Sequence, residues 1–62
     1  MDEAYLIAQK ALIAAIQTEV YGMLAENTIR LSRGESLAYP EESFKEKAEE
    51  LRSIHQMIME NR

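Results

Sequence analysis

The side chains that could support chemistry in this sequence are a single histidine, His55, and two glutamates spaced seven residues apart, Glu19 and Glu26. A di-iron carboxylate site needs a Glu from one helix and a Glu-x-x-His pair from another, all facing inward. The residue three positions before His55 is Arg52, so the Glu-x-x-His pair is missing. We therefore expect both glutamates to be solvated, and we predict no metal, no cofactor and no catalytic residue.

Other catalytic patterns are also missing from the 62 residues. The sequence has no cysteine, no glycine-rich phosphate loop and no H-E-x-x-H zinc motif. Its length allows one small domain. The sequence has 47% hydrophobic and 29% charged residues, which is the composition of a globular protein. We predict a protein that binds rather than catalyses. The lack of cysteine suits a reducing compartment, so we expect a cytoplasmic location.

The N-terminal segment is apolar, but it does not have the features of a membrane or export signal. The stretch 4–16 contains only two polar residues, Gln9 and Lys10, and is followed by the polar residues 17–19. A membrane span needs about 18 or more apolar residues, and a secretory signal needs a basic leader, whereas Asp2 and Glu3 are acidic. We expect a buried helix here and no membrane contact.

Two helical patterns separated by one break predict a single helical-hairpin domain over residues 1–62. The first helix is predicted at about 2–33 and the second at about 40–61, with a loop at 34–39. Gly34 is the residue type that takes a left-handed C-terminal cap. Pro40 favours a helix start, and Ser43 with Glu46 offers a competing capping box.

The first helix has two apolar faces when its residues are placed at 3.6 per turn. The bulky face includes polar Gln9 and Asn27 among Tyr5, Leu6, Leu12, Ile13, Ile16, Val20, Met23, Leu24 and Leu31. The other face is a small-residue seam with unbroken 4-3 spacing, typical of a coiled coil: Ala4, Ala8, Ala11, Ala15, Thr18, Gly22, Ala25 and Ile29. This spacing gives Gly22 a packing reason, because small residues let a partner helix approach closely.

The second helix has one principal apolar seam with the same spacing, formed by Phe44, Ala48, Leu51, His55 and Ile58, and Ile54, Met57 and Met59 broaden it towards the C-terminus. One folded-back helix can cover one face of the first helix but not two. The first helix should also extend for about 45 Å, so the chain should be a rod. A soluble monomer seldom exposes a contiguous apolar face. The predicted fold is therefore an all-α, two-helix antiparallel hairpin that forms a homo-oligomeric bundle, and the simplest such bundle is a dimer of four helices.

Three polar residues within the apolar faces are candidates for fixing register in that oligomer: His55, Gln9 and Asn27. A histidine buried in its neutral form loses stability when it is forced to protonate. If His55 is buried in this way, assembly should weaken below about pH 6. The alternative is that His55 is a satisfied interface residue with no function of its own.

The length and hairpin plan resemble those of the Rop family of plasmid copy-number regulators, which are dimeric four-helix bundles that bind paired RNA loops. The resemblance is one of plan, so no functional residue is carried over from it. Eleven acidic against seven scattered basic residues give a net charge of −4. Phosphate binding normally shows the opposite balance, so the charge argues against a nucleic-acid partner.

The function that best fits these features is binding to a larger protein, as a small acidic oligomeric regulator, adaptor or inhibitor. An acidic hairpin suits a basic target surface. The alternative is sequestration of a small ligand in a pocket between subunits. The candidate contacts for a ligand or partner are Arg30, Arg33, Leu37 and Tyr39, with His55 as a further polar group in the ligand hypothesis.

Overall fold

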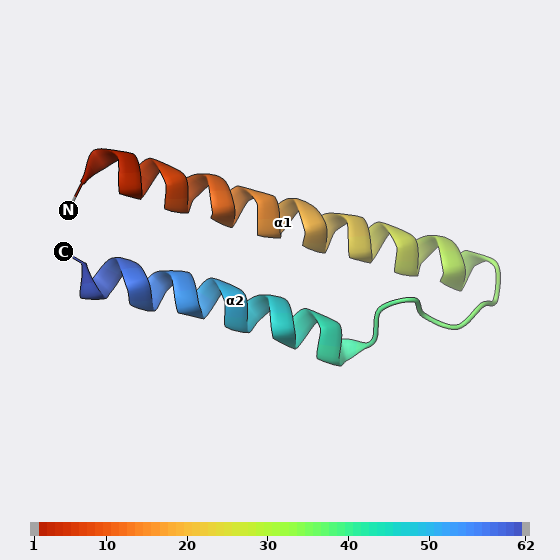
Figure 1. Ribbon diagram of the computed structural model, residues 1–62. Helices are drawn as coiled ribbons and strands as arrows, with labels where there is room; N and C mark the ends of the chain where they lie inside the picture. The colour runs from red at the N-terminus through yellow and green to blue at the C-terminus, as the bar shows by residue number, and fades with distance from the viewer. Residues whose placement is uncertain (1, 62) are drawn as a thin grey trace.

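The computed structural model describes residues 2–61 as two helices packed side by side in a hairpin (Figure 1). Helix α1 comprises Glu3–Ser32 and helix α2 comprises Glu41–Glu60. No strand occurs in this part of the chain, and the predicted all-helical hairpin is confirmed. Neither helix has a stretch long and apolar enough for a membrane crossing, as far as residues 2–61 are concerned.

Both ends of α1 are capped by the residues at its boundaries. The Asp2 carboxylate accepts a hydrogen bond from the Ala4 amide at 3.1 Å, which satisfies a free donor of the first turn. At the other end Gly34 takes a left-handed conformation with φ 73°. The Gly34 amide donates to the Leu31 carbonyl and the Glu35 amide to the Arg30 carbonyl, which is a Schellman cap. Between these caps α1 continues through Gly22 without a break.

Helix α2 begins at Glu41, directly after Pro40, and Pro40 occupies the N-cap position in an extended conformation. The Ser43 amide donates to the Pro40 carbonyl at 3.0 Å, so Ser43 lies inside the first turn. The competing start at Ser43 is therefore not used. Glu41 and Glu42 lie in this first turn, and their negative charges are stabilised by the positive end of the helix dipole.

The core lies between the helices and contains few residues. Ile16 and Met23 of α1 and Ile54 of α2 are buried, and Ile54 is only 2% exposed. The predicted seam of α2 is wrong at one position, because His55 is exposed and Ile54 packs against α1 instead. The bulky face of α1 is also only partly covered, because Leu12, Leu24 and Leu31 remain exposed.

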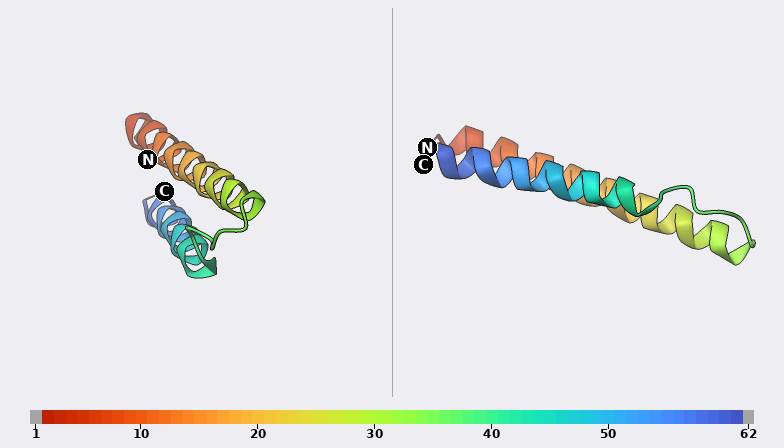
Figure 2. Two further views of the ribbon diagram at one scale, coloured as in Figure 1. Left: turned by 90° about the vertical axis from the view of Figure 1, so that its right-hand side faces the viewer. Right: turned by 90° about the horizontal axis from the view of Figure 1, so that it is seen from below.

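The chain is a thin rod whose Cα extents are 49 × 18 × 8 Å, as expected for a helix of 30 residues with one partner. Helix α2 has 20 residues and stops short of the far end of α1, so the loop runs back along the last turns of α1 (Figure 2). The start of α1 and the end of α2 lie together at the opposite end of the hairpin, where the side chains of Tyr5 and Asn61 meet. This difference in helix length leaves space beside α1 at the loop end.

Candidate binding surfaces

The first candidate surface is the side of α1 that faces away from α2. It contains the eight residues of the small-residue seam, all of which are exposed. Four more exposed residues border the seam on one side at seven-residue intervals, and all twelve are uncharged. We call this surface the open face; it comprises Ala4, Ile7, Ala8, Ala11, Ala14, Ala15, Thr18, Tyr21, Gly22, Ala25, Thr28 and Ile29. The other side of the seam is bordered at the same interval by Tyr5, Leu12, Glu19 and Glu26.

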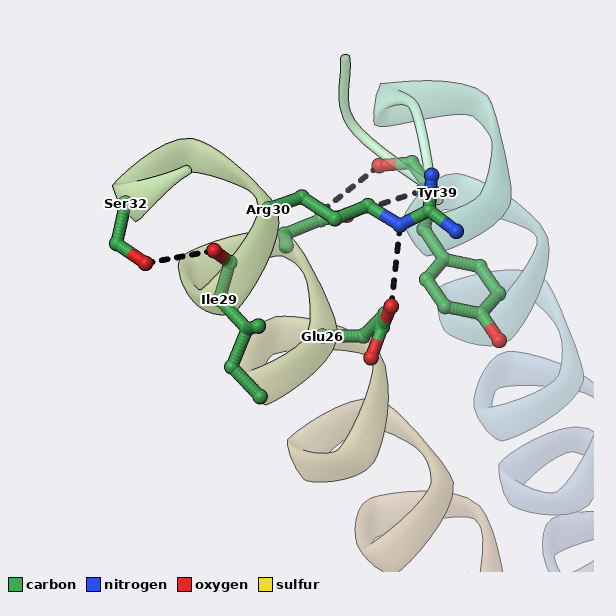
Figure 3. Close-up of polar contacts among 6 residues, drawn as sticks. Glu26, Ile29, Arg30, Ser32 and Tyr39 are labelled. Carbon is green, nitrogen blue, oxygen red and sulfur yellow. Dashed lines mark hydrogen bonds and ion pairs between the residues drawn. The ribbon is translucent and has the colours of Figure 1, made fainter. Parts of the chain in front are cut away.

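The open face is directed away from α2 because of its position around the helix. At 3.6 residues per turn, its centre lies roughly 140° from the centre of the buried positions of α1. Ile29 illustrates this placement, since its side chain points away from α2 (Figure 3). A Cβ atom added to Gly22 would meet no other atom within 4 Å. At Gly22 the hairpin therefore places no side chain over this surface, although Gly22 also lies at the edge of the groove between the helices.

The open face combines large exposed side chains with satisfied polar groups. Ile7 is 58% exposed and Tyr21 is 72% exposed. The hydroxyl of Thr18 donates to the Ala14 carbonyl, and that of Thr28 donates to the Leu24 carbonyl, each at 2.9 Å. Because both hydroxyls are paired within α1, a partner could cover them without leaving an unpaired donor.

A second surface is an open groove of about 700 Å³ at the loop end, where α2 stops short of α1. Met23 and Arg30 of α1, Tyr39 of the loop and Lys47 of α2 are among the residues that line it. The Arg30 guanidinium is paired with the Glu26 carboxylate at 3.0 Å, and the Tyr39 ring lies beside this pair (Figure 3). The groove therefore offers an aromatic ring next to charges that are already paired.

Lys47 provides the main ionic link between the two helices along the groove. Its ammonium group lies 2.6 Å from the Glu19 carboxylate of α1 and 3.3 Å from that of Glu50 in α2. The hydrogen bond to Glu19, followed by the one to Glu50, raises the pKa of Lys47 above its ordinary value of 10.5. Glu19, expected to be solvated, has a side chain that is 55% exposed and forms an ion pair with Lys47. Across residues 2–61, no three His, Cys, Asp or Glu side chains come close enough together to hold a metal ion.

Asn27, predicted as a polar interface residue, has a partner within its own chain. Its side-chain amide donates to the Tyr39 carbonyl at 2.8 Å, and its side-chain oxygen accepts from the Tyr39 amide at 3.0 Å. Asn27 is 9% exposed, so this pair of bonds is shielded from water. It fixes the loop against α1 and sets the position of Tyr39 in the groove. The sequence gives no local signal for this contact, which joins residues twelve positions apart.

The other predicted polar residues are not brought together. Gln9 lies between the helices with a buried side-chain oxygen that has no partner in the described part of the chain. His55, Arg33 and Leu37 are exposed. None of these three is among the residues that line the groove, whereas Arg30 and Tyr39 both line it.

Comparison with known proteins adds no family assignment, because no protein-family model, no curated protein and no solved structure matches this chain.

Proposed function

We propose that this chain acts by binding, as a homo-oligomer that serves as a regulator, adaptor or inhibitor of a larger protein. The observation that supports this proposal is the open face of α1, which carries no charge over 26 residues of helix and is exposed throughout. Soluble monomers seldom leave an apolar surface of this length in contact with water. A pair of helices with three buried apolar residues also has little core of its own, so assembly would supply the missing burial.

Helix α2 is the element available to a larger partner once α1 is covered. It carries six glutamates against three basic residues, and its outer side is exposed. Its ion pairs, such as Lys45 with Glu41 at 3.6 Å, are on the surface and contribute little to stability. This acidic excess supports binding to a basic surface, where complementary charge accelerates association and excludes wrong partners.

The first test is the absolute mass in solution, measured by light scattering on a sizing column down to low micromolar concentration. We expect a discrete multiple of the 7.1 kDa chain mass. A mass of one chain at every concentration would contradict the oligomer.

The second test addresses the larger partner. The tagged chain should recover one protein at a fixed ratio, and the double variant Glu42→Lys with Glu49→Lys should fail to recover it. A control outside α2, Gln17→Lys with Glu35→Lys, adds three units of positive charge against four in the α2 variant and should retain the partner. Equal recovery by both variants would remove α2 from the binding surface.

The groove favours a second candidate function, the sequestration of a small ligand. Its volume of about 700 Å³ is within the range of small-molecule sites, and Tyr39 is held in it by the bonds to Asn27. A ligand that binds only the folded chain raises the melting temperature by mass action. We would screen small metabolites by thermal shift against the chain and its Tyr39→Ala variant. A shift seen for the original chain and lost in the variant would support sequestration.

A further inference from the structure

We propose that the open face of α1 binds the same face of a second copy in an antiparallel arrangement with one register. This inference rests on the proposed homo-oligomer and specifies its interface. The seam is symmetric about the point between Ile16 and Gln17. When a second α1 is reversed about that point, Ala8 lies opposite Ala25 of the second copy. Ala11 then lies opposite Gly22 and Ala15 opposite Thr18, so both helices use the whole seam.

Side-chain size distinguishes this arrangement from a parallel one. In the antiparallel register every layer of the seam contains at least one alanine, and the largest seam residue, Ile29, lies opposite Ala4. A parallel pair in register would place Ile29 against its own copy at one end and Ala4 against its own copy at the other. Only the antiparallel pair therefore keeps a constant separation, at the short end of the usual range of roughly 8–10 Å between helix axes.

Charge at the ends of α1 favours the same arrangement. Asp2 and Glu3 lie at its start, and Arg30 and Arg33 at its end. Reversal of the second copy places the acidic start of each α1 level with the basic end of the other, whereas a parallel pair places like charges together. The two helix dipoles also oppose each other in the antiparallel pair, which is favourable. Charge complementarity therefore identifies a second copy of this chain as the occupant of the open face.

The border of the open face fits this partner as well. Tyr21, which is 72% exposed, comes to lie beside Ala14 of the second copy, so the largest border residue meets one of the smallest. The paired hydroxyls of Thr18 and Thr28 need no new partner on burial. The open face itself contains no charged side chain, and the glutamates on the other border of the seam, Glu19 and Glu26, are already paired with Lys47 and Arg30.

The position of the open face also determines the shape of the dimer. In a square four-helix bundle each helix contacts two neighbours roughly 90° apart, but the two contact faces of α1 are separated by roughly 140°. The two α1 helices would therefore form the centre of a flattened assembly, with one α2 on each outer side. Such a dimer presents two acidic α2 surfaces that face in opposite directions.

Cysteine cross-linking tests the register directly, because the natural chain contains no cysteine. Two single variants, Ala8→Cys and Ala25→Cys, are oxidised under mild conditions alone and as an equimolar mixture. We expect a disulfide-linked dimer in the mixture, in about half of the dimers, which is the fraction that random exchange of subunits produces. Each variant alone should stay unlinked, because residue 8 of one copy is about 25 Å along the axis from residue 8 of the other. Glu49→Cys, on the outer side of α2, is the control and should link in no combination.

The alternative outcomes are distinguished by light scattering on the same reduced samples. Links within each variant alone, with no link between the two different variants in the mixture, would indicate a parallel pair and overturn the proposed register. A dimeric mass without any link would overturn the use of the open face while leaving the homo-oligomer intact. A monomeric mass for the unmodified chain would contradict the homo-oligomer itself, and the register with it.

Discussion

The two faces of α1 differ in side-chain size more than in polarity. The side of α1 that packs against α2, here called the covered face, contributes Ile16 and Met23 to the contact. The open face is built mainly from alanine, threonine and glycine. A large side chain reaches across to a helix that is held by a loop, and its burial contributes about 1.5–3 kcal/mol. A small side chain gains little unless a second helix approaches closely along its whole length. The hairpin therefore covers part of the face of large residues and leaves the face of small residues exposed.

The largest effect should come from the covered face. Ile54→Ala removes the most buried side chain, at 2% exposure, and leaves a cavity between the helices. We expect a loss of about 2–5 kcal/mol of stability, enough to unfold a hairpin with so small a core. Thermal unfolding followed by circular dichroism measures it. Ile7→Ala on the open face removes an equal volume from a side chain that is 58% exposed, so the hairpin itself should keep its stability.

The next effect should separate assembly from folding. Ala11→Leu places a bulky side chain in the seam, and overpacking of a close interface costs roughly 1–3 kcal/mol. We expect the dimer dissociation constant to rise at least about tenfold, while the helix content of the chain stays the same. Dilution series by light scattering give the constant, with Gln17→Leu outside the open face as the control. Unchanged assembly in the Ala11→Leu variant would mean that the open face is simply solvated.

Asn27→Ala tests whether the covered face also organises the loop. The substitution leaves the Tyr39 amide and carbonyl without their partners, and we expect a loss of about 1–3 kcal/mol. Hydrogen exchange at the Tyr39 amide should accelerate more than exchange in the middle of α2. Thr28→Ala, the neighbouring substitution on the open face, should leave that amide unchanged.

Gly22→Ala should have opposite effects on the stability of α1 and on assembly through the open face. An added Cβ meets nothing within 4 Å in the hairpin, and alanine is favoured over glycine in a helix by about 1 kcal/mol. We expect a higher melting temperature for α1 under conditions in which the chain is monomeric, together with weaker assembly. If assembly instead strengthens, the second copy does not approach closely at this position.

The smallest effect concerns the ion pair of Lys47 with Glu19. Because the folded pKa of Lys47 is raised, its stabilisation is complete below pH 10.5 and is lost as the pH rises through the raised value. Lys47→Met should therefore show less loss of stability on alkaline titration than the original chain. Lys10→Met, at an exposed position of α1 outside the contact with α2, is the matched control. Parallel alkaline profiles for the original chain and Lys47→Met would show that the pair contributes nothing.

The 3.6-residue periodicity, Gly34 and Pro40 predicted the two helices, the C-terminal cap of α1 and the start of α2, because those signals are local. Gly34 and the acidic first turns act within a few residues of their own positions. The rotation of α2 could not be predicted in the same way. Ile54 and His55 lie next to each other at the edge of the apolar seam, and the choice between them depends on the position of α1.

The groove depended on features that a sequence pattern does not contain. It results from the ten-residue difference between the two helices and from the path of the loop, which the bonds between Asn27 and Tyr39 hold against α1. Arg30 and Tyr39 were candidates from their residue types alone, and the path of the loop brings them to one site. The seam, in contrast, was recognisable from its spacing, and the single chain leaves it exposed.

The hairpin topology implies an order of folding events. Contacts between the helices enclose progressively longer segments away from the loop: 12 residues at Asn27 and Tyr39, 28 at Glu19 and Lys47, and 56 at Tyr5 and Asn61. Each doubling of an enclosed segment adds about 0.6 kcal/mol of closure entropy. Docking of the helices should therefore start at the loop and proceed towards the chain ends, and thermal fraying should run in reverse. In the antiparallel dimer that we propose, the last part of one hairpin to close would lie against the first part of the other.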